Sequence, residues 1–322
     1  MKAKVLQLLR DHSEEHLSGE KISEMLGCSR TMVWKYIDAL RKEGYKISAV
    51  PNKGYRIANE GDPLSEHEIV SRIKDNSLFH KIVYYDSLES TQTAANKLVS
   101  EGADEGTVVI ADEQTGGRGR LGRKWESAKN SGIWMSLILR PAISMRQAPQ
   151  LTLITAVAAV RAVEAVTNAE VHIKWPNDIL MNGRKLAGIL TEMQADPDRV
   201  KSVIIGIGLN VNQTGFEGEL SQIATSLAAE TGGTYSRSAL IAVLLKEFEW
   251  IYELYLSKGF SVIKPMWEAH ASTIGRRITA SNLQGEITGV AEGIDEDGVL
   301  LLRDDAGELR KIYSADISFA KS

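Results

Sequence analysis

The sequence predicts a multidomain α+β protein with a small helical module, a larger core built on a mixed sheet and a small all-β domain. Its 322 residues exceed what one hydrophobic core usually organises. The periodicity of apolar residues changes near residue 62 and again near residue 276. We therefore expect domains at 1–62, 63–275 and 276–322. With 43% hydrophobic and 25% charged residues, the composition is that of an ordinary globular chain.

The first domain carries three short helical patterns. Apolar residues recur at helical spacing, and Ser18 and Ser29 stand where they can cap the second and third helices. Gly27 ends the second helix. Two helices that flank such a tight turn are typical of a helix-turn-helix, in which the third helix enters the major groove of DNA.

A hairpin follows the third helix. Alternating residues at 45–50 and 55–57 flank Pro51-Asn52-Lys53-Gly54, which predicts a wing with a basic tip. Residues 1–60 hold eleven Lys/Arg against eight Asp/Glu, whereas the rest of the chain is acidic. We therefore predict a winged helix-turn-helix; a helical protein-interaction module is the alternative. The candidate DNA contacts are Ser29, Arg30, Thr31, Trp34, Lys35 and Lys53.

The core alternates helical and strand patterns, which predicts a mixed sheet with helices packed on it. Strands are expected at 81–85, 107–111, 133–139, 171–175, 185–193 and 203–209. Beyond residue 276, short strand patterns at 277–280, 286–294, 299–303 and 308–313 predict a small all-β barrel. The sequence of that barrel indicates no chemistry of its own.

A glycine-rich cationic loop, Gln114 to Trp125, is the central feature of the core, with four Arg/Lys and four Gly in twelve positions. Its Gly117–Gly122 stretch matches the dinucleotide motif G-x-G-x-x-G, but it leads into a strand rather than a helix, and Arg140 stands where an acidic residue is required. Glycine lets backbone N–H groups approach an anion, and guanidinium groups bind phosphate or carboxylate in pairs of hydrogen bonds. The loop therefore favours an anionic ligand; a solvated basic loop or a second nucleic-acid contact is the alternative.

Three further motifs follow: KWPND at 174–178, RKLAGILTE at 184–192 and GIGLNVN at 206–212. With the loop and the winged module, they resemble the bifunctional biotin–protein ligases that also act as biotin operon repressors. The resemblance covers essentially the whole chain. It implies a ligase core similar to class II synthetases and a C-terminal SH3-like β-barrel.

The resemblance also implies the chemistry. Biotin and ATP, with Mg²⁺, would form biotinyl-5′-AMP, and biotin would pass to a lysine of the biotin carboxyl carrier protein of acetyl-CoA carboxylase. In such a reaction the protein mainly positions the two substrates and neutralises their negative charge. No nucleophilic side chain is needed, which agrees with a single cysteine, Cys28.

Each site residue is implied by its place in a family motif. Ser90, Thr91, Gln92 and Gln114 would hydrogen-bond biotin, and Gly117, Arg118, Gly119 and Arg120 would close over biotin and the phosphates. Lys185 would be the main electrostatic catalyst, aided by Arg118 and Arg120, and Asp178 would be a catalytic carboxylate that serves either Mg²⁺ or the incoming lysine amine. Trp125 would pack on adenine and Asn210 would contact the nucleotide or the metal. The plainer alternatives are that Trp125 is a core side chain, that Asn210 is a turn residue and that Lys185 is an ordinary surface lysine.

The same resemblance implies operator DNA as a partner, a homodimer when biotinyl-AMP is bound, a cytoplasmic location and no membrane association. Two other functions remain open from the residues. One is a repressor that senses a cofactor without catalysis, which the intact loop, Asp178 and Lys185 argue against. The other is a ligase for another cofactor acid such as lipoate, which the DNA-binding module argues against.

Overall fold

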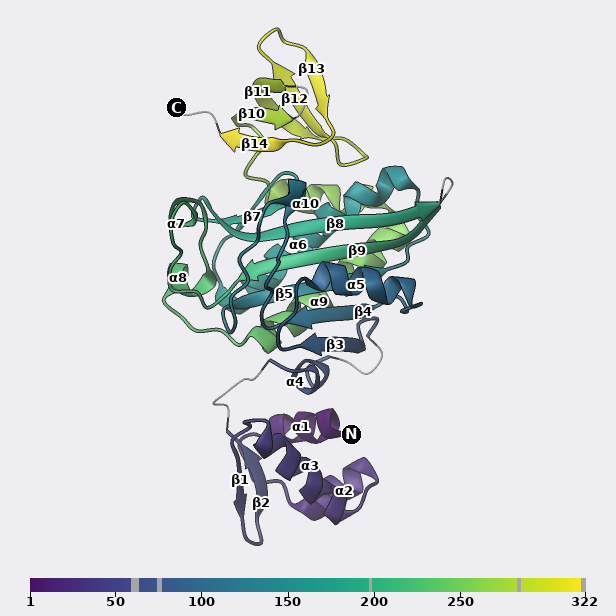
Figure 1. Cartoon of the computed structure of the whole chain (residues 1–322), viewed down its shortest axis with the longest axis vertical. Helices are drawn as coiled ribbons and strands as arrows, with labels where there is room; N and C mark the ends of the chain where they lie inside the picture. The colour runs from purple at the N-terminus through teal and green to yellow at the C-terminus, as the bar shows by residue number, and fades with distance from the viewer. Residues whose placement is uncertain (59–63, 74–76, 197–198, 283–284, 320–322) are drawn as a thin grey trace.

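The computed structural model describes residues 1–58, 64–73, 77–196, 199–282 and 285–319, and shows three parts in a row along its long axis (Figure 1). The winged module lies at one end, the mixed-sheet core in the middle and the small β domain at the other end. The predicted boundary at residue 62 lies outside the described residues. The boundary at 275–276 falls just before strand β10, which begins at Arg277, and both boundaries stay predictions.

The N-terminal module has the elements that its sequence predicts. Helices α1 (Lys2–Asp11), α2 (Gly19–Leu26) and α3 (Arg30–Lys42) precede the antiparallel wing strands β1 (Ile47–Val50) and β2 (Gly54–Ile57). The side chains of Ser18 and Ser29 accept hydrogen bonds from backbone N–H groups in the first turns of α2 and α3, at 3.1 and 3.3 Å. Gly27 ends α2 with a left-handed φ of 60°.

The core is a seven-stranded sheet in the order β3-β4-β5-β9-β8-β7-β6, in which only β3 and β4 are parallel. Its strands are β3 (Lys81–Tyr85), β4 (Thr107–Ala111), β5 (Gly132–Leu139), β6 (His172–Lys174), β7 (Asp178–Met181), β8 (Arg184–Asp196) and β9 (Arg199–Asn210). All six predicted strands are present. The additional strand, β7, forms a hairpin with β8 across Asn182-Gly183, a turn signal that the sequence did contain.

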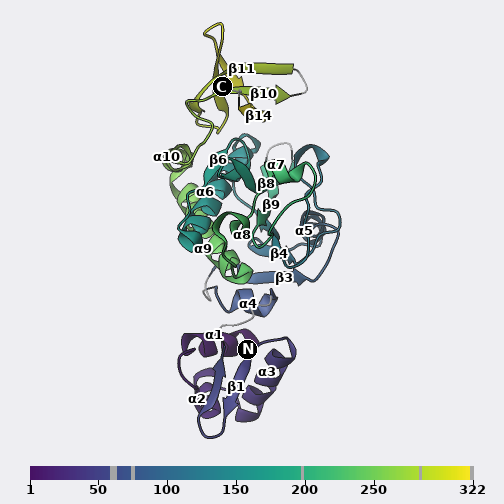
Figure 2. The same ribbon diagram turned by 90° about the vertical axis from the view of Figure 1, so that its left-hand side faces the viewer.

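Helices cover both faces of this sheet (Figure 2). Helix α5 (Thr91–Ser100) lies on one face, and α6 (Ala148–Thr167) and α9 (Arg237–Lys258) lie on the other. Strands β4 and β5 are consequently buried at every residue. Helix α6 with its preceding turn is long and apolar enough to cross a membrane, but 67% of its most apolar window is buried inside the protein, as in the core helix of a globular domain.

The remaining helices are short. They are α4 (Glu66–Val70), α7 (Leu220–Ile223), α8 (Leu227–Thr231) and α10 (Lys264–Ala269), with 3₁₀ turns at Arg120–Gly122, Met145–Gln147 and Phe260–Val262. Helix α4 packs against α1 of the winged module. There the guanidinium of Arg10 pairs with the fully buried carboxylate of Glu68, and the Tyr45 hydroxyl lies 3.3 Å from that of Ser65. The winged module is thus joined to the core by polar contacts.

The C-terminal domain is an antiparallel sheet in the order β13-β12-β11-β10-β14. Its strands are β10 (Arg277–Asn282), β11 (Gly285–Ile294), β12 (Leu300–Asp304), β13 (Leu309–Ile312) and β14 (Asp316–Phe319). The all-β prediction is confirmed, and β14 is an additional strand. Within the described residues the ladder runs from β13 to β14 with no pairing between these two ends, so a closed barrel stays a prediction.

Candidate functional site

A pocket of about 510 Å³ opens on the face of the core sheet next to the N-terminus of α5. It draws on the α5 start, the loop 114–126, strands β6 to β9, helix α7 and the C-terminal strand β14. The predicted site residues that line it are Ser90, Thr91, Gln92, Gln114, Arg118, Gly119, Arg120, Trp125, Asp178, Lys185 and Asn210. The structure therefore brings together residues that lie up to 120 positions apart in the chain.

The floor of the pocket is a cluster of hydrogen-bonded polar side chains. The side-chain oxygen of Gln114 accepts from the backbone N–H of Thr91 at 2.8 Å, and its amide nitrogen donates to Ser127 at 2.8 Å. The hydroxyl of Ser136, on β5, lies 2.9 Å from that of Thr91 and 3.0 Å from the side-chain oxygen of Gln92. These bonds fix donors and acceptors around a concave surface, which suits a small polar ring.

The cationic loop folds back on itself as a hairpin above this floor. Gln114 bridges to Ser127 and Arg118 to Lys124, and the 3₁₀ turn at the tip holds exposed Leu121 at a φ of 57°. Gly117 does not line the pocket. It is buried, and a Cβ at this position would lie 2.5 Å from a backbone oxygen of the same loop. Glycine is therefore needed here for the loop to fold back on itself.

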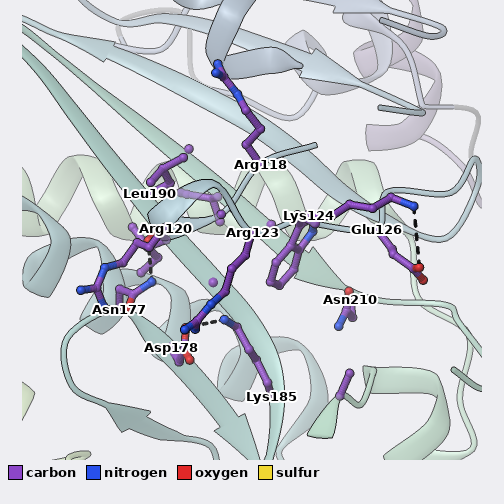
Figure 3. A pocket seen from close by; sticks show the side chains of 18 of the residues that line it. Arg118, Arg120, Arg123, Lys124, Glu126, Asn177, Asp178, Lys185, Leu190 and Asn210 are labelled. Atoms are coloured by element: carbon purple, nitrogen blue, oxygen red, sulfur yellow. Dashed lines mark hydrogen bonds and ion pairs between the residues drawn. The ribbon is translucent and has the colours of Figure 1, made fainter. Parts of the chain in front are cut away.

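The arginines of this loop point in different directions (Figure 3). Arg118 turns away from the other cations and donates to the Thr93 hydroxyl at 2.9 Å. Arg120 donates to the side-chain oxygen of Asn177 and to Ser314 of the C-terminal domain, both at 3.0 Å. Burial lowers the pKa of the Arg120 guanidinium, although Asp316 and Asp178 oppose this effect. The loop is thus fastened to the C-terminal domain.

Lys185 and Asp178 face each other from neighbouring strands. Lys185 Nζ lies 2.6 Å from Asp178 Oδ1, an ion pair whose angle is not that of a hydrogen bond, and both side chains are partly exposed to the pocket. The same ammonium lies 5.2 Å from the centre of the Trp125 ring, within the range of a cation–π contact. Lys185 is therefore not an unattached surface lysine.

Trp125 lies over two glycines that face each other across β8 and β9. A Cβ at Gly208 would lie 2.6 Å from the indole, and one at Gly188 would lie 3.0 Å from it. Two residues earlier, a Cβ at Gly206 would meet the Gln92 side-chain oxygen at 2.8 Å. The glycines of the GIGLN segment thus make room for pocket side chains, a role that their spacing alone did not indicate.

Replacing Gly208 with valine should displace Trp125 and lower pocket-dependent activity at least about tenfold, because a side chain at this position overlaps the ring. Overpacking typically costs about 1–3 kcal/mol, so the chain should still fold. Steady-state activity and the melting temperature check this. Gly215→Ala is the matched control, since a Cβ there meets nothing within 4 Å; equal activity in both variants would contradict the packing role.

Asn210 lines the pocket, but its side chain also has partners within the protein. Its amide donates to the backbone oxygen of Thr225 at 2.9 Å, and its side-chain oxygen accepts from Gln213 at 3.3 Å. The residue is buried, with 4% of its surface exposed. The structure thus gives Asn210 a part in holding the loop after β9, and its contact with a nucleotide stays a prediction.

Sequence reasoning missed several pocket residues. Three apolar side chains of the segment after β9 form one wall, and two residues of β14 close the far end. The missed residues include Phe216, Leu220, Ile223, Asp316 and Phe319. The apolar spacing at 216–223 was a usable signal, whereas nothing local linked β14 to a loop almost 200 positions earlier.

Positive charge dominates the pocket. Six Lys/Arg side chains line it against three Asp/Glu, an excess of three. No group of three or more His, Cys, Asp or Glu that could hold a metal occurs in the part of the chain that the structure describes. Asp178 fits a Mg²⁺ that takes its other ligands from phosphate and water, which is how Mg²⁺ usually binds beside nucleotides. The arrangement suits two anions that must meet.

The predicted DNA contacts share one exposed surface. Ser29, Arg30, Thr31, Trp34 and Lys35 are exposed on the first turns of α3, and Lys53 is exposed at the tip of the wing. Val33, Ile37 and Leu40 point inward, as expected. Among the described residues, Arg30, Lys35 and Lys53 have no ion-pair partner. These three cations are therefore available to phosphate, although Ser29 already caps its own helix.

Three family models match the chain. Residues 2–56 match an HTH domain, residues 84–210 the biotin/lipoate A/B protein ligase family, and residues 273–320 the biotin protein ligase C-terminal domain. The order of the three matches is the order of the three parts of the fold.

Relatives match over almost the full length. The bifunctional ligase/repressor BirA of Bacillus subtilis is 50% identical over 97% of both chains. The biotin–[acetyl-CoA-carboxylase] ligase of Paracoccus denitrificans is 35% identical and covers 72% of this chain and 97% of its own length. The biotin protein ligase of Aquifex aeolicus, solved with biotin and ATP, superposes with a TM-score of 0.66 at 31% identity, over 76% of this chain and all of its own. The chain belongs to the biotin protein ligase family, in its bifunctional ligase/repressor branch.

Proposed function

We infer that this protein activates biotin with ATP in the pocket under the glycine-rich loop, passes biotin to a lysine of the biotin carboxyl carrier protein, and represses transcription through its winged module. The observation that carries the enzymatic part is the convergence of Lys185, Asp178, Arg120 and the polar floor in one cationic pocket. The exposed cations of α3 and the wing support the DNA-binding part.

The first reaction joins two anions. A carboxylate oxygen of biotin attacks the α-phosphorus of ATP, the bond from phosphorus to the bridging oxygen breaks, and pyrophosphate leaves with that electron pair. Ser90, Thr91, Gln92 and Gln114 would hold the ureido ring of biotin on the polar floor. Lys185 would neutralise charge between the carboxylate and the α-phosphate, which is the main task of a protein in such a transfer.

The second reaction transfers the biotinyl group. The neutral amine of the acceptor lysine attacks the mixed anhydride, an amide forms and AMP leaves. Asp178, which borders the pocket with 20% of its side chain exposed, would orient that amine and accept its hydrogen bond. Mg²⁺ held by Asp178 and phosphate would supply further charge neutralisation. Trp125 would pack against adenine, and the loop after β9 would cover it.

A test of the proposed function is incubation with ATP, biotin and the isolated carrier domain, followed by intact-mass measurement. We expect one biotinyl group on one lysine, and no modification when ATP is omitted. A carrier that stays unmodified, or that accepts lipoate instead, would contradict the assignment. The lipoate alternative is disfavoured by the full-length match to ligase/repressors.

Deleting residues 1–62 should leave biotin activation within about threefold of the full chain, because every pocket residue lies beyond residue 89. The relative from Paracoccus covers only 72% of this chain at 97% of its own length, which supports an autonomous core. The cut removes Arg10 from the Glu68 carboxylate, but that carboxylate still accepts a hydrogen bond from Arg72 at 2.9 Å. Adenylate formation by the truncated chain is the measurement, and a folded but inactive truncation would show that the winged module helps to build the pocket.

A homodimer that forms when biotinyl-AMP is bound would present two α3 helices to a palindromic operator. A cytoplasmic location agrees with the ATP requirement and with a single cysteine, Cys28, which can form no internal disulfide.

A further inference from the structure

Among the six Lys/Arg side chains that line the pocket, Lys174 differs from the other five in its lack of a hydrogen-bonding or anionic side-chain partner among the described residues. The ammonium of Lys174, at the end of β6, has no hydrogen bond and no ion pair with any side chain in the described part of the chain, although the residue is half buried. The others each have a polar or anionic neighbour: Arg118 at Thr93, Arg120 at Asn177, Arg123 at Asp316, Lys124 at Glu126 and Lys185 at Asp178. A buried cation without an anionic partner is costly, and binding an anion removes that cost.

The surroundings of Lys174 hold it at one end of the pocket. Lys174 and Asp178 are direct partners across β6 and β7, but the Asp178 carboxylate is already taken by Lys185 from the opposite side. Lys174 Nζ lies 5.9 Å from the centre of the Phe319 ring, and Arg276 stacks on the same ring at 3.9 Å. Burial lowers the pKa of the Lys174 amine, and Asp178 acts against that shift.

The order of the strands arranges the polar pocket residues in sequence across the sheet, from β5 to β6. Gln92 meets β5 and β9 through Ser136 and the backbone oxygen of Ile204, Lys185 lies on the next strand, β8, and Asp178 on β7. Lys174 follows on β6, with neighbouring strands about 4.8 Å apart. The polar floor, Lys185, Asp178 and Lys174 therefore succeed one another across the sheet.

This order matches the geometry of the first reaction. In an in-line displacement the attacking and leaving oxygens lie on opposite sides of phosphorus. If the biotin carboxylate approaches from the floor and the α-phosphate lies at Lys185, pyrophosphate leaves toward β7 and β6. We propose that Lys174 is the pyrophosphate-binding lysine of this site, its ammonium holding an oxygen of the β- or γ-phosphate of ATP. This assignment rests on the proposed function.

The assignment separates two kinds of ligand. ATP and pyrophosphate carry the oxygens that Lys174 would bind, whereas biotinyl-AMP has lost them. Removing the charge of Lys174 should therefore weaken ATP and pyrophosphate but not the adenylate. A lysine that merely supported the fold would affect all three ligands, and one that served the acceptor amine would slow only the second reaction.

The test uses the full chain with Lys174→Met, which keeps the length of the side chain, and Lys174→Arg, which keeps the charge. Lys246→Met is the control, an exposed lysine of α9 on the opposite face of the sheet. We would measure the KM for ATP, the inhibition constant of pyrophosphate, the affinity for added biotinyl-AMP and the rate of transfer from it to the carrier.

For Lys174→Met we expect the KM for ATP and the inhibition constant of pyrophosphate to rise about tenfold or more, as for loss of a hydrogen bond to a charged group. Affinity for biotinyl-AMP and the transfer rate should stay within about twofold, and Lys174→Arg should recover most of the loss. Unchanged pyrophosphate inhibition, or an equal loss in adenylate affinity or transfer, would overturn the assignment. Wild-type protein that makes no adenylate would instead refute the proposed function.

Discussion

Lys185→Met is expected to lower the rate of biotinyl-AMP formation about a hundredfold or more while the protein keeps its fold. The side chain keeps its length, but the ammonium that lies 2.6 Å from Asp178 and 5.2 Å from the Trp125 ring is lost. Removal of one preorganised group that stabilises charge in a transition state typically costs about 10²–10³ in rate. The variant also leaves the Asp178 carboxylate unpaired beside the incoming phosphates, which adds repulsion.

Single-turnover formation of labelled adenylate measures this effect, and Lys246→Met serves as the control on the far side of the sheet. Arg120→Gly should also lose adenylate, since Arg120 joins the loop to Asn177 and Ser314. Arg118→Gly tests whether an arginine that now contacts Thr93 turns toward the ligand. Near wild-type rates in all three variants would refute the site assignment.

Biotinyl-AMP is expected to raise operator affinity about thirtyfold to a hundredfold by promoting a dimer. A ligand that orders the loop can stabilise a neighbouring surface, and a coupling of about 2–3 kcal/mol is enough for this shift. Sedimentation with and without the adenylate, together with operator binding at fixed salt, measures both steps. Unchanged mass and unchanged affinity at saturation would leave a ligase whose DNA-binding module works independently of the intermediate.

A double variant of α3 tests the contact with DNA separately. Arg30→Ala with Lys35→Ala should weaken operator binding and reduce the slope of its salt dependence by about two, since each phosphate contact contributes about 0.9. Both residues are exposed on α3 and far from every pocket residue. Adenylate formation should therefore be unchanged in the double variant, which separates DNA contact from catalysis.

Local signals predicted most of the fold. Capping serines, a glycine with a left-handed φ and the basic turn of the wing placed the winged module, because each acts within a few residues. Strand β7 was not predicted, since four residues after Pro176-Asn177 give too short a pattern. Strand β14 was missed for the same reason, at the end of a domain with short strands.

The pocket could be predicted only in part. Polar and charged residues in the loop and in KWPND predicted an anion-binding site, because so many glycines and cationic side chains in a short segment suit the binding of phosphate or carboxylate. The closing of the pocket by Asp316 and Phe319 depends on how two domains pack, which no local pattern encodes. The hydrogen bonds of the Asn210 side chain within the protein likewise depend on tertiary structure. The same holds for the space that Gly206 and Gly208 leave for pocket side chains.

The most direct test of the central claim is whether the wild-type chain makes biotinyl-AMP from biotin and ATP. Purified protein, labelled biotin, ATP and Mg²⁺ are incubated without a carrier, and the products are separated, with lipoate in a parallel reaction. We expect one equivalent of protein-bound biotinyl-AMP with release of pyrophosphate, and no lipoyl-AMP. Absence of the adenylate, or its formation from lipoate in preference to biotin, would contradict the account.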